Sequence, residues 1–340
     1  MPPGKTFIPR ERNFTSLPQS QMMTNHRWRT GFDLEAISCG VAVCQRMKPV
    51  FFFRPMPKTK GRLPNFIIVG ATKAGTTSLD FYLSLHPEIH MARPKEPRFF
   101  IDASEPLGRW QRGLTWYRSL FVSDKALCGE ASPTYASWSA KQGVFERMQS
   151  LVPDAKILFV VREHFARLYS SYLMNVRYRG IEDSLSEFLL NNQWALDASM
   201  YGERMQDLLR FYDRERLLVL EAEELQQRRA ETLRSVFEFL GVDAGFHSLF
   251  FRHKRHDSRF HAYPNKLGRK ILRHPATRML EQKLPPSVFY HLRNGLNAVF
   301  AGQEPEMALD PGFQQKLSVE FQQDTGKLRS LTGLALPSLG

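Results

Sequence analysis

The stretch from Asn65 to Ser78, with the sequence NFIIVGATKAGTTS, constrains the fold more than any other part of the chain. It begins with the apolar run 66–69, flanked by turn formers, which is typical of a buried β-strand. Small residues and one lysine, Lys73, follow, and hydroxyl residues then open a helix that we expect to end near Leu85. This combination predicts an anion site, because a helix start leaves N–H groups free and glycine lets the backbone approach a phosphate.

Two other interpretations of this stretch are an ordinary strand–turn–helix unit and the phosphate loop of a nucleoside triphosphatase. In an ordinary capped strand–turn–helix unit, packing would gain nothing from a lysine inside the turn. A nucleoside triphosphatase carries G-x-x-x-x-G-K-[ST], with the lysine directly after the second glycine. Here Lys73 comes two positions before Gly75. The phosphate chemistry therefore fits, whereas the nucleoside-triphosphate spacing does not.

A second buried strand is predicted at 157–161, and it ends at Arg162. A helix is expected from about residue 166 to 178, which places Ser170 two turns into it at about 3.6 residues per turn. Parallel sheets bind ligands at the carboxyl ends of their strands. Alone, Arg162 could equally form a surface salt bridge, but beside the glycine-containing loop we expect it to bind the same ligand.

The glycine-containing loop and the stretch REHFARLYSSY resemble the sulfotransferase superfamily, and its heparan-sulfate-type and bacterial branch more than its small-phenol branch. The resemblance covers about residues 64–335. It implies that the loop holds the 5′-phosphosulfate of 3′-phosphoadenosine 5′-phosphosulfate, and that Arg162 and Ser170 bind the 3′-phosphate. In relatives a basic loop closes over these phosphates, and Arg259 is our candidate here. The loop residues expected to bind the donor are Lys73, Ala74, Gly75, Thr76, Thr77 and Ser78.

The sequence ARPKEPRFF at 92–100 predicts a rigid, exposed loop, because two prolines flank a Lys-Glu pair. In the resembled branch, the glutamate ahead of the aromatic pair is the catalytic base, which assigns that role to Glu96. The alternative is a solvated loop carboxylate. The small-phenol branch uses a histidine base, so His90 and His164 are the alternative bases, although most histidines are expected at the surface.

The chain departs from the family pattern at two places. His164 stands where a proline usually follows the strand-terminal arginine, which is expected to weaken the turn. Ala131 replaces the lysine of G-E-K-S-P-x-Y at the edge of the acceptor cleft, which puts an acceptor contact there in doubt. The stretch from Trp110 to Phe121 matches W-Y-x-x-x-F and is interpreted as an aromatic core helix.

The predicted fold is α/β with three layers: a central, mostly parallel sheet between helices, like that of P-loop nucleoside kinases. Residues 63–335 are expected to form the sulfotransferase domain. Residues 1–62 have no sustained period and are expected to be a basic, disordered arm, with an organelle transit peptide as the alternative. A helix at 200–214, a strand at 217–220 and a helix at 231–240 complete the expected core.

The net charge of +13 is concentrated in two segments. Residues 1–64 hold eleven basic and three acidic side chains, and residues 252–283 hold ten and two. A near-neutral body between basic segments argues against a nucleic-acid-binding domain. The cysteines, three in 340 residues, form no disulfide framework or metal motif, so a reducing, cytoplasmic location without a metal is expected.

The resemblance implies in-line transfer of a sulfuryl group to a hydroxyl or amine, without a metal. The acceptor could be a glycan, a lipid or a small metabolite. A nucleotide-dependent kinase on a related scaffold remains an alternative, as does a non-catalytic module that binds acidic polymers. Neither alternative gives Glu96, Arg162 and Ser170 a common purpose. No apolar run is long enough to predict a membrane-spanning helix.

Overall fold

The computed structural model describes residues 61–340, except for 106, 138–142, 253–261, 285 and 307. The chain divides into two compact units, residues 1–54 and 55–340, and the described residues all belong to the second. The predicted arm at 1–62 lies outside the described residues apart from its last two positions.

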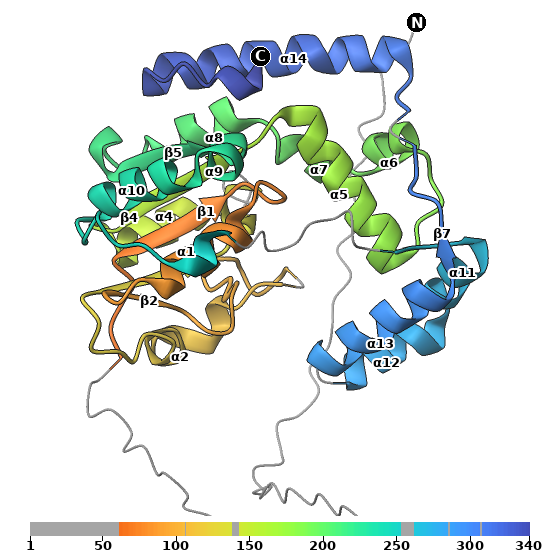
Figure 1. Cartoon of the computed structure of the whole chain (residues 1–340), viewed down its shortest axis with the longest axis horizontal. Coiled ribbons are helices and arrows are strands. Elements are labelled where there is room, and N and C mark those ends of the chain that lie inside the picture. Colours follow the sequence, from red (N-terminus) through yellow and green to blue (C-terminus); the bar gives the residue numbers. More distant parts are fainter. Residues whose placement is uncertain (1–60, 106, 138–142, 253–261, 285, 307) are drawn as a thin grey trace, which may run out of the picture. The chain divides into compact units, whose positions relative to one another are not determined.

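A parallel five-stranded sheet forms the centre of this unit, in the order β2-β3-β1-β4-β5. Helices lie on both sides of it (Figure 1), which confirms the predicted α/β fold. The strands are β1 (Phe66–Gly70), β2 (Ile89–Met91), β3 (Leu127–Ala131), β4 (Lys156–Val161) and β5 (Leu217–Glu221).

The first part of the helical layers follows the prediction closely, since α1 and α10 end at the expected residues. The helices before β6 are α1 (Thr76–Leu85), α2 (Gly113–Ser119), α4 (Val144–Leu151), α5 (His164–Arg179), α6 (Leu185–Asn191), α7 (Gln193–Asp197), α8 (Tyr201–Leu208), α9 (Ala222–Gln227) and α10 (Arg229–Leu240). The predicted helix at 200–214 is wrong in length. It stops at Leu208 because the chain then turns, and Tyr212 is buried with its hydroxyl on the carbonyl of Val152, 3.2 Å away.

The C-terminal part is mostly helical, as expected. Its elements are β6 (Tyr263–Pro264), α11 (Lys266–Arg273), α12 (Pro275–Lys283), α13 (Pro286–Val299), β7 (Ala301–Gly302) and α14 (Pro311–Thr332). The antiparallel pair β6–β7 was not predicted, because two residues per strand are too few to show a period.

The core explains why the strands carry continuous apolar runs. Every residue of β1 is buried, and so are five of the six in β4, as expected for strands covered on both faces. Gly129 in β3 is required by this packing, because a Cβ there would lie 2.1 Å from the ring of Phe66. The sheet is thus held rigidly, and the loops at its carboxyl edge have a fixed base.

Candidate active site

Lys73, Glu96 and Arg162 lie in the segments that leave the carboxyl ends of strands of the central sheet. The loop with Lys73 follows β1, and Arg162 follows β4, which is directly paired with β1. The loop with Glu96 follows β2 and contacts the end of β3, where the Glu96 amide donates to the carbonyl of Ala131 at 3.2 Å. The parallel sheet therefore brings residues as far apart in sequence as Lys73 and Arg162, 89 positions, to one edge.

The loop between β1 and α1 has the conformation that an anion site requires. Lys73 and Gly75 have positive φ, 67° and 89°, and Gly75 is the N-cap of α1. Nothing would lie within 4 Å of a Cβ at Gly75, so the backbone conformation rather than crowding selects glycine here. Among the described residues, the amides of Lys73, Gly75, Thr76 and Thr77 make no hydrogen bond.

The other predicted loop residues have mixed exposure. Ala74 and Thr76 are buried, Thr77 and Ser78 are half-buried, and Gly75 is exposed. The Ser78 amide turns back to the carbonyl of Gly75 at 2.9 Å. The free donors thus belong to the loop and the first helical turn, as the helix N-terminus predicts.

Lys73 is the electrostatic centre of the loop. Within the described part of the chain its ammonium group has no ion-pair or hydrogen-bond partner. Burial and the charges of Arg162, Arg167 and Arg177 together lower the pKa of Lys73 to about 8, although the charge of Glu96 acts to raise it. A half-buried cation among other cations is a site that gains from a bound anion.

Arg162 connects the second predicted motif to this loop. Its Nη1 donates to the backbone carbonyl of Lys73 at 3.0 Å, and its own carbonyl accepts from the hydroxyl of Tyr201 at 2.8 Å. Its Nε is buried and has no partner among the described residues. The guanidinium is therefore anchored at one nitrogen and has a donor left over.

The turn after Arg162 does not need the missing proline. Glu163 is the N-cap of α5, and its carboxylate accepts from the amides of Phe165 at 2.9 Å and Ala166 at 2.6 Å. The expected weakening of this turn by His164 is thus offset by a side-chain cap. Ser170 lies on α5 and is half-buried, with no hydrogen bond to its hydroxyl in the described structure.

Arg167, which belongs to the stretch REHFARLYSSY, supports the loop but was not predicted to belong to the site. Its side chain is fully buried and donates to Thr72, with both the carbonyl and Oγ1 at 3.4 Å, and to Ser199 Oγ at 2.6 Å. It also donates to the carbonyl of Ala195. Burial lowers the pKa of Arg167 to about 10, which leaves it charged at neutral pH.

Glu96 lies in a partly buried loop, so the predicted exposure of this loop is wrong. Its carboxylate pairs with Lys95 at 3.0 Å and with Arg98. Burial acts to raise the pKa of Glu96, but the two cations outweigh it and hold the pKa below its ordinary value. The group is therefore ionised at neutral pH and able to accept a proton.

The two histidines considered as alternative bases are both engaged. His164 is 2% exposed and packs between the rings of Tyr201 and Phe321, at centroid distances of 4.9 and 4.4 Å. Burial lowers the pKa of His164 to about 4, and Arg167 contributes. His90 makes a 3.0 Å hydrogen bond with the carbonyl of Leu120. The expectation of a surface position is wrong for His164, and also for His86, which is fully buried.

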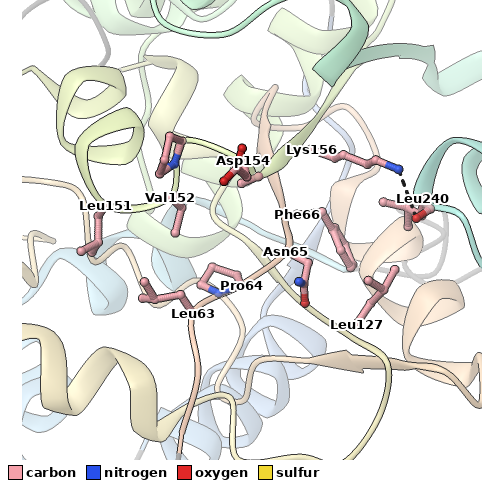
Figure 2. A pocket seen from close by; sticks show the side chains of 12 residues that line it. Leu63, Pro64, Asn65, Phe66, Leu127, Leu151, Val152, Asp154, Lys156 and Leu240 are labelled. Carbon is pink, nitrogen blue, oxygen red and sulfur yellow. Dashed lines mark hydrogen bonds between the residues drawn. The ribbon is translucent and has the colours of Figure 1, made fainter.

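At the opposite edge of the sheet, the described residues form no similar group of unpaired donors. A hollow of about 390 Å³ lies there, lined by residues that include Asn65, Leu127 and Lys156 at the starts of β1, β3 and β4 (Figure 2). Lys156 is occupied, since its Nζ donates to the carbonyl of Leu240 at 3.2 Å. The donors without a described partner, namely the loop amides, the Lys73 ammonium and the Nε of Arg162, lie together at the carboxyl edge.

Arg259 lies outside the described residues. Among the described residues no group of three or more His, Cys, Asp and Glu side chains could hold a metal ion. A search of the same residues finds no helix long and apolar enough to span a membrane.

These features define an α/β protein of the P-loop type, whose phosphate loop lies beside a second, arginine-containing motif. The chain belongs to the sulfotransferase domain family, since residues 63–262 match the model of that domain. It is similar to the solved structure of a sulfotransferase from Alicyclobacillus acidocaldarius, with 25% identity and a TM-score of 0.58. The match covers 81% of this chain and 98% of that one.

Curated relatives act on heparan sulfate according to their names. Human bifunctional heparan sulfate N-deacetylase/N-sulfotransferase 2 is 30% identical over 201 residues, which are 54% of this chain and 23% of that protein. Human heparan sulfate glucosamine 3-O-sulfotransferase 6 is 28% identical over 191 residues, 53% of each chain. The match thus spans about a quarter to a half of these relatives' length.

Proposed function

We propose that this protein transfers a sulfuryl group from 3′-phosphoadenosine 5′-phosphosulfate to a hydroxyl or amine of a glycan acceptor. The observation that carries the proposal is the Lys73 ammonium, which has no partner among the described residues and lies beside Arg162 in a loop with four amides that make no hydrogen bond there. An ATP-type loop would place its lysine after the second glycine. The family match favours sulfuryl transfer over the kinase and the non-catalytic alternatives.

The donor fits the side chains that are present. Its 5′-phosphosulfate would take the free amides of Lys73, Gly75, Thr76 and Thr77, where the helix dipole favours negative charge. The Lys73 ammonium would neutralise the charge that grows on the leaving phosphate. Such preorganised donors cost no reorganisation when the bond breaks.

The 3′-phosphate is the group that distinguishes this donor from ATP. We assign it to Arg162 and Ser170, because the Nε of Arg162 and the hydroxyl of Ser170 have no hydrogen-bond partner among the residues that the structure describes. An arginine fork suits a phosphate. Arg259 remains a proposed third contact from the basic segment.

Glu96 is the proposed catalytic base. It is ionised, its loop lies at the same edge as Lys73, and its charge is felt by that lysine. It would accept the proton of the acceptor hydroxyl or amine as sulfur bonds to that oxygen or nitrogen and its bond to the 5′-phosphate oxygen of the donor breaks. Lys95 and Arg98 now hold both carboxylate oxygens, so the acceptor would replace one of these pairs.

The glycan acceptor rests on the relatives' names, which include both an N-sulfotransferase and 3-O-sulfotransferases. A domain at 63–335, a separate arm at 1–62 and a cytoplasmic location also remain proposals. The buried thiol of Cys128 is free, which is compatible with a reducing compartment.

The deciding experiment uses donor labelled in its sulfonate group, screened against heparan-type glycans, phenols and lipids. We expect label in the glycan fraction. In parallel, adenosine 3′,5′-bisphosphate should raise the melting temperature, because a ligand of the folded state stabilises it. A larger shift with ATP–Mg²⁺ would reject the donor assignment, and label only in phenols or lipids would reject the acceptor class.

A further inference from the structure

A ladder of hydrogen bonds fastens the Glu96 loop to the end of β3. Three alternate amides in the second half of the loop donate to the segment 131–135. The bonds run from Glu96 N to Ala131 O (3.2 Å), from Arg98 N to Ser132 Oγ (3.1 Å) and from Phe100 N to the Tyr135 hydroxyl (3.4 Å). The last two acceptors are side chains whose own positions need support.

Glu130 supplies that support. Its Oε2 accepts from Ser132 Oγ at 2.7 Å, and its Oε1 accepts from Tyr135 at 3.0 Å and from Tyr117 at 2.5 Å. The carboxylate is fully buried and pairs with no cation among the described residues. A buried carboxyl group is costly to keep, so three hydroxyl donors on one such group indicate a purpose beyond packing.

The backbone of the Glu96 loop is strained and has to be stabilised by contacts from other parts of the chain. Glu96 and Arg98 both have left-handed backbone, with φ of 61° and 53°, although neither is glycine. Such residues cost roughly 1–3 kcal/mol each and persist only where surrounding contacts enforce them. Arg98 is enforced directly by Ser132 and hence by Glu130.

We propose that Glu130 is a positioning residue that holds Glu96 in reach of the acceptor, acting through Ser132 and Tyr135. This rests on the proposed function, in which Glu96 is the base. Glu130 touches neither Glu96 nor Lys73 through any described hydrogen bond. Its effect is carried by the backbone of the loop.

Titration offers a readout that a merely structural group would lack. Burial raises the pKa of Glu130 to about 7, although its three hydroxyl partners act to lower it, as does the charge of Lys95. Protonation would turn one oxygen from acceptor to donor and loosen the bond from Ser132. Turnover should therefore rise with pH through about 7, whereas Glu96 is already ionised at lower pH.

The test compares Glu130→Gln and Ser132→Ala with Tyr212→Phe, which removes a buried tyrosine hydroxyl that donates to the carbonyl of Val152 and makes no described hydrogen bond to the Glu96 loop or to Glu130. Turnover should fall by about ten- to a hundredfold in the first two, the scale of a misplaced catalytic group. Affinity for adenosine 3′,5′-bisphosphate should stay unchanged, and Glu130→Gln should lose the rise near pH 7. Tyr212→Phe should keep its turnover.

Two further measurements make the outcome decisive. In a Glu96→Gln background, Ser132→Ala should cost nothing more, because its effect passes through Glu96. Amide exchange in residues 95–100 should quicken in Glu130→Gln and Ser132→Ala but not in Tyr212→Phe. Unchanged exchange and turnover in Ser132→Ala would overturn the proposal. If exchange quickens in the two variants as expected but the wild-type protein itself transfers no sulfuryl group, the proposed function is overturned instead.

Discussion

The guanidinium of Arg162 donates a 3.0 Å hydrogen bond to the backbone carbonyl of Lys73. This bond joins the end of β4 to the loop after β1, so the two motifs that we propose to bind the donor's phosphates are directly connected. The carbonyl that accepts this bond belongs to a residue with left-handed backbone, so the bond helps to hold the loop in that conformation. A change at Arg162 is therefore expected to affect both the 3′-phosphate and the shape of the loop.

Removing the Lys73 ammonium should slow the reaction. We expect Lys73→Ala to lower turnover by about 10²–10³, the scale of losing one preorganised donor to the transition state. Steady-state kinetics with labelled donor would measure it. The exposed Lys316→Ala on α14 is the control and should react normally. Turnover within a factor of a few of wild type would remove Lys73 from the mechanism.

The pH dependence of donor capture should report Lys73. Its pKa is lowered from 10.5 to about 8 in the free protein, so its charge is lost as pH rises through about 8. The value of kcat/KM for the donor should therefore fall above that pH, since this ratio reports the free enzyme. Lys73→Arg should move the fall upward, because a guanidinium stays protonated. A wild-type profile that stays flat well above pH 8 would contradict this assignment.

Glu96→Gln keeps the shape of the side chain and removes its proton acceptor. Turnover should fall by about 10²–10⁴, while calorimetry should find the affinity for adenosine 3′,5′-bisphosphate nearly unchanged. Glu146→Gln, at an exposed position of α4, controls for loss of a carboxylate. If the Glu96 variant keeps a substantial share of its turnover, the base is elsewhere, and His90 would be tested next.

Arg162→Ala should lower the affinity for adenosine 3′,5′-bisphosphate by about ten- to a hundredfold, since a charged hydrogen bond contributes about 1.5–3 kcal/mol. The affinity for adenosine 5′-phosphosulfate, which lacks the 3′-phosphate, should fall much less. Ser170→Ala should act likewise but more mildly, and the double variant should lose less than the sum. Arg179→Ala, exposed on the same helix, is the control. Equal weakening of both ligands would mean that Arg162 only holds the carbonyl of Lys73.

Arg167→Met should destabilise the fold rather than only the chemistry. It would leave the carbonyl of Ala195 and the hydroxyl of Ser199 without their partner, at about 1–3 kcal/mol for each buried group. Urea denaturation would measure the loss, with Arg179→Met as the exposed control. Full stability of Arg167→Met would show that water replaces these bonds.

Much of the site could be predicted from short stretches of sequence. The strands β1 and β4 are short apolar runs, and Arg162 directly follows one of them, so its place at the sheet edge needs no tertiary information. Gly75 likewise reports a local requirement, because its positive φ belongs to the loop itself. The supporting residues Arg167 and Glu130 could not be assigned in this way, since their partners Ala195 and Tyr117 are distant in sequence or on another element.

The sequence by itself determined the α/β fold, the glycine-containing loop after β1 and the arginine at the end of β4, because backbone preference and strand burial are encoded within a few consecutive residues. Only the tertiary structure decided how these parts are held. It buried His164 between Tyr201 and Phe321, and it bound the Glu96 loop to β3 through Glu130. Burial and hydrogen bonding depend on which distant side chains meet, and the packing of the whole domain sets those meetings.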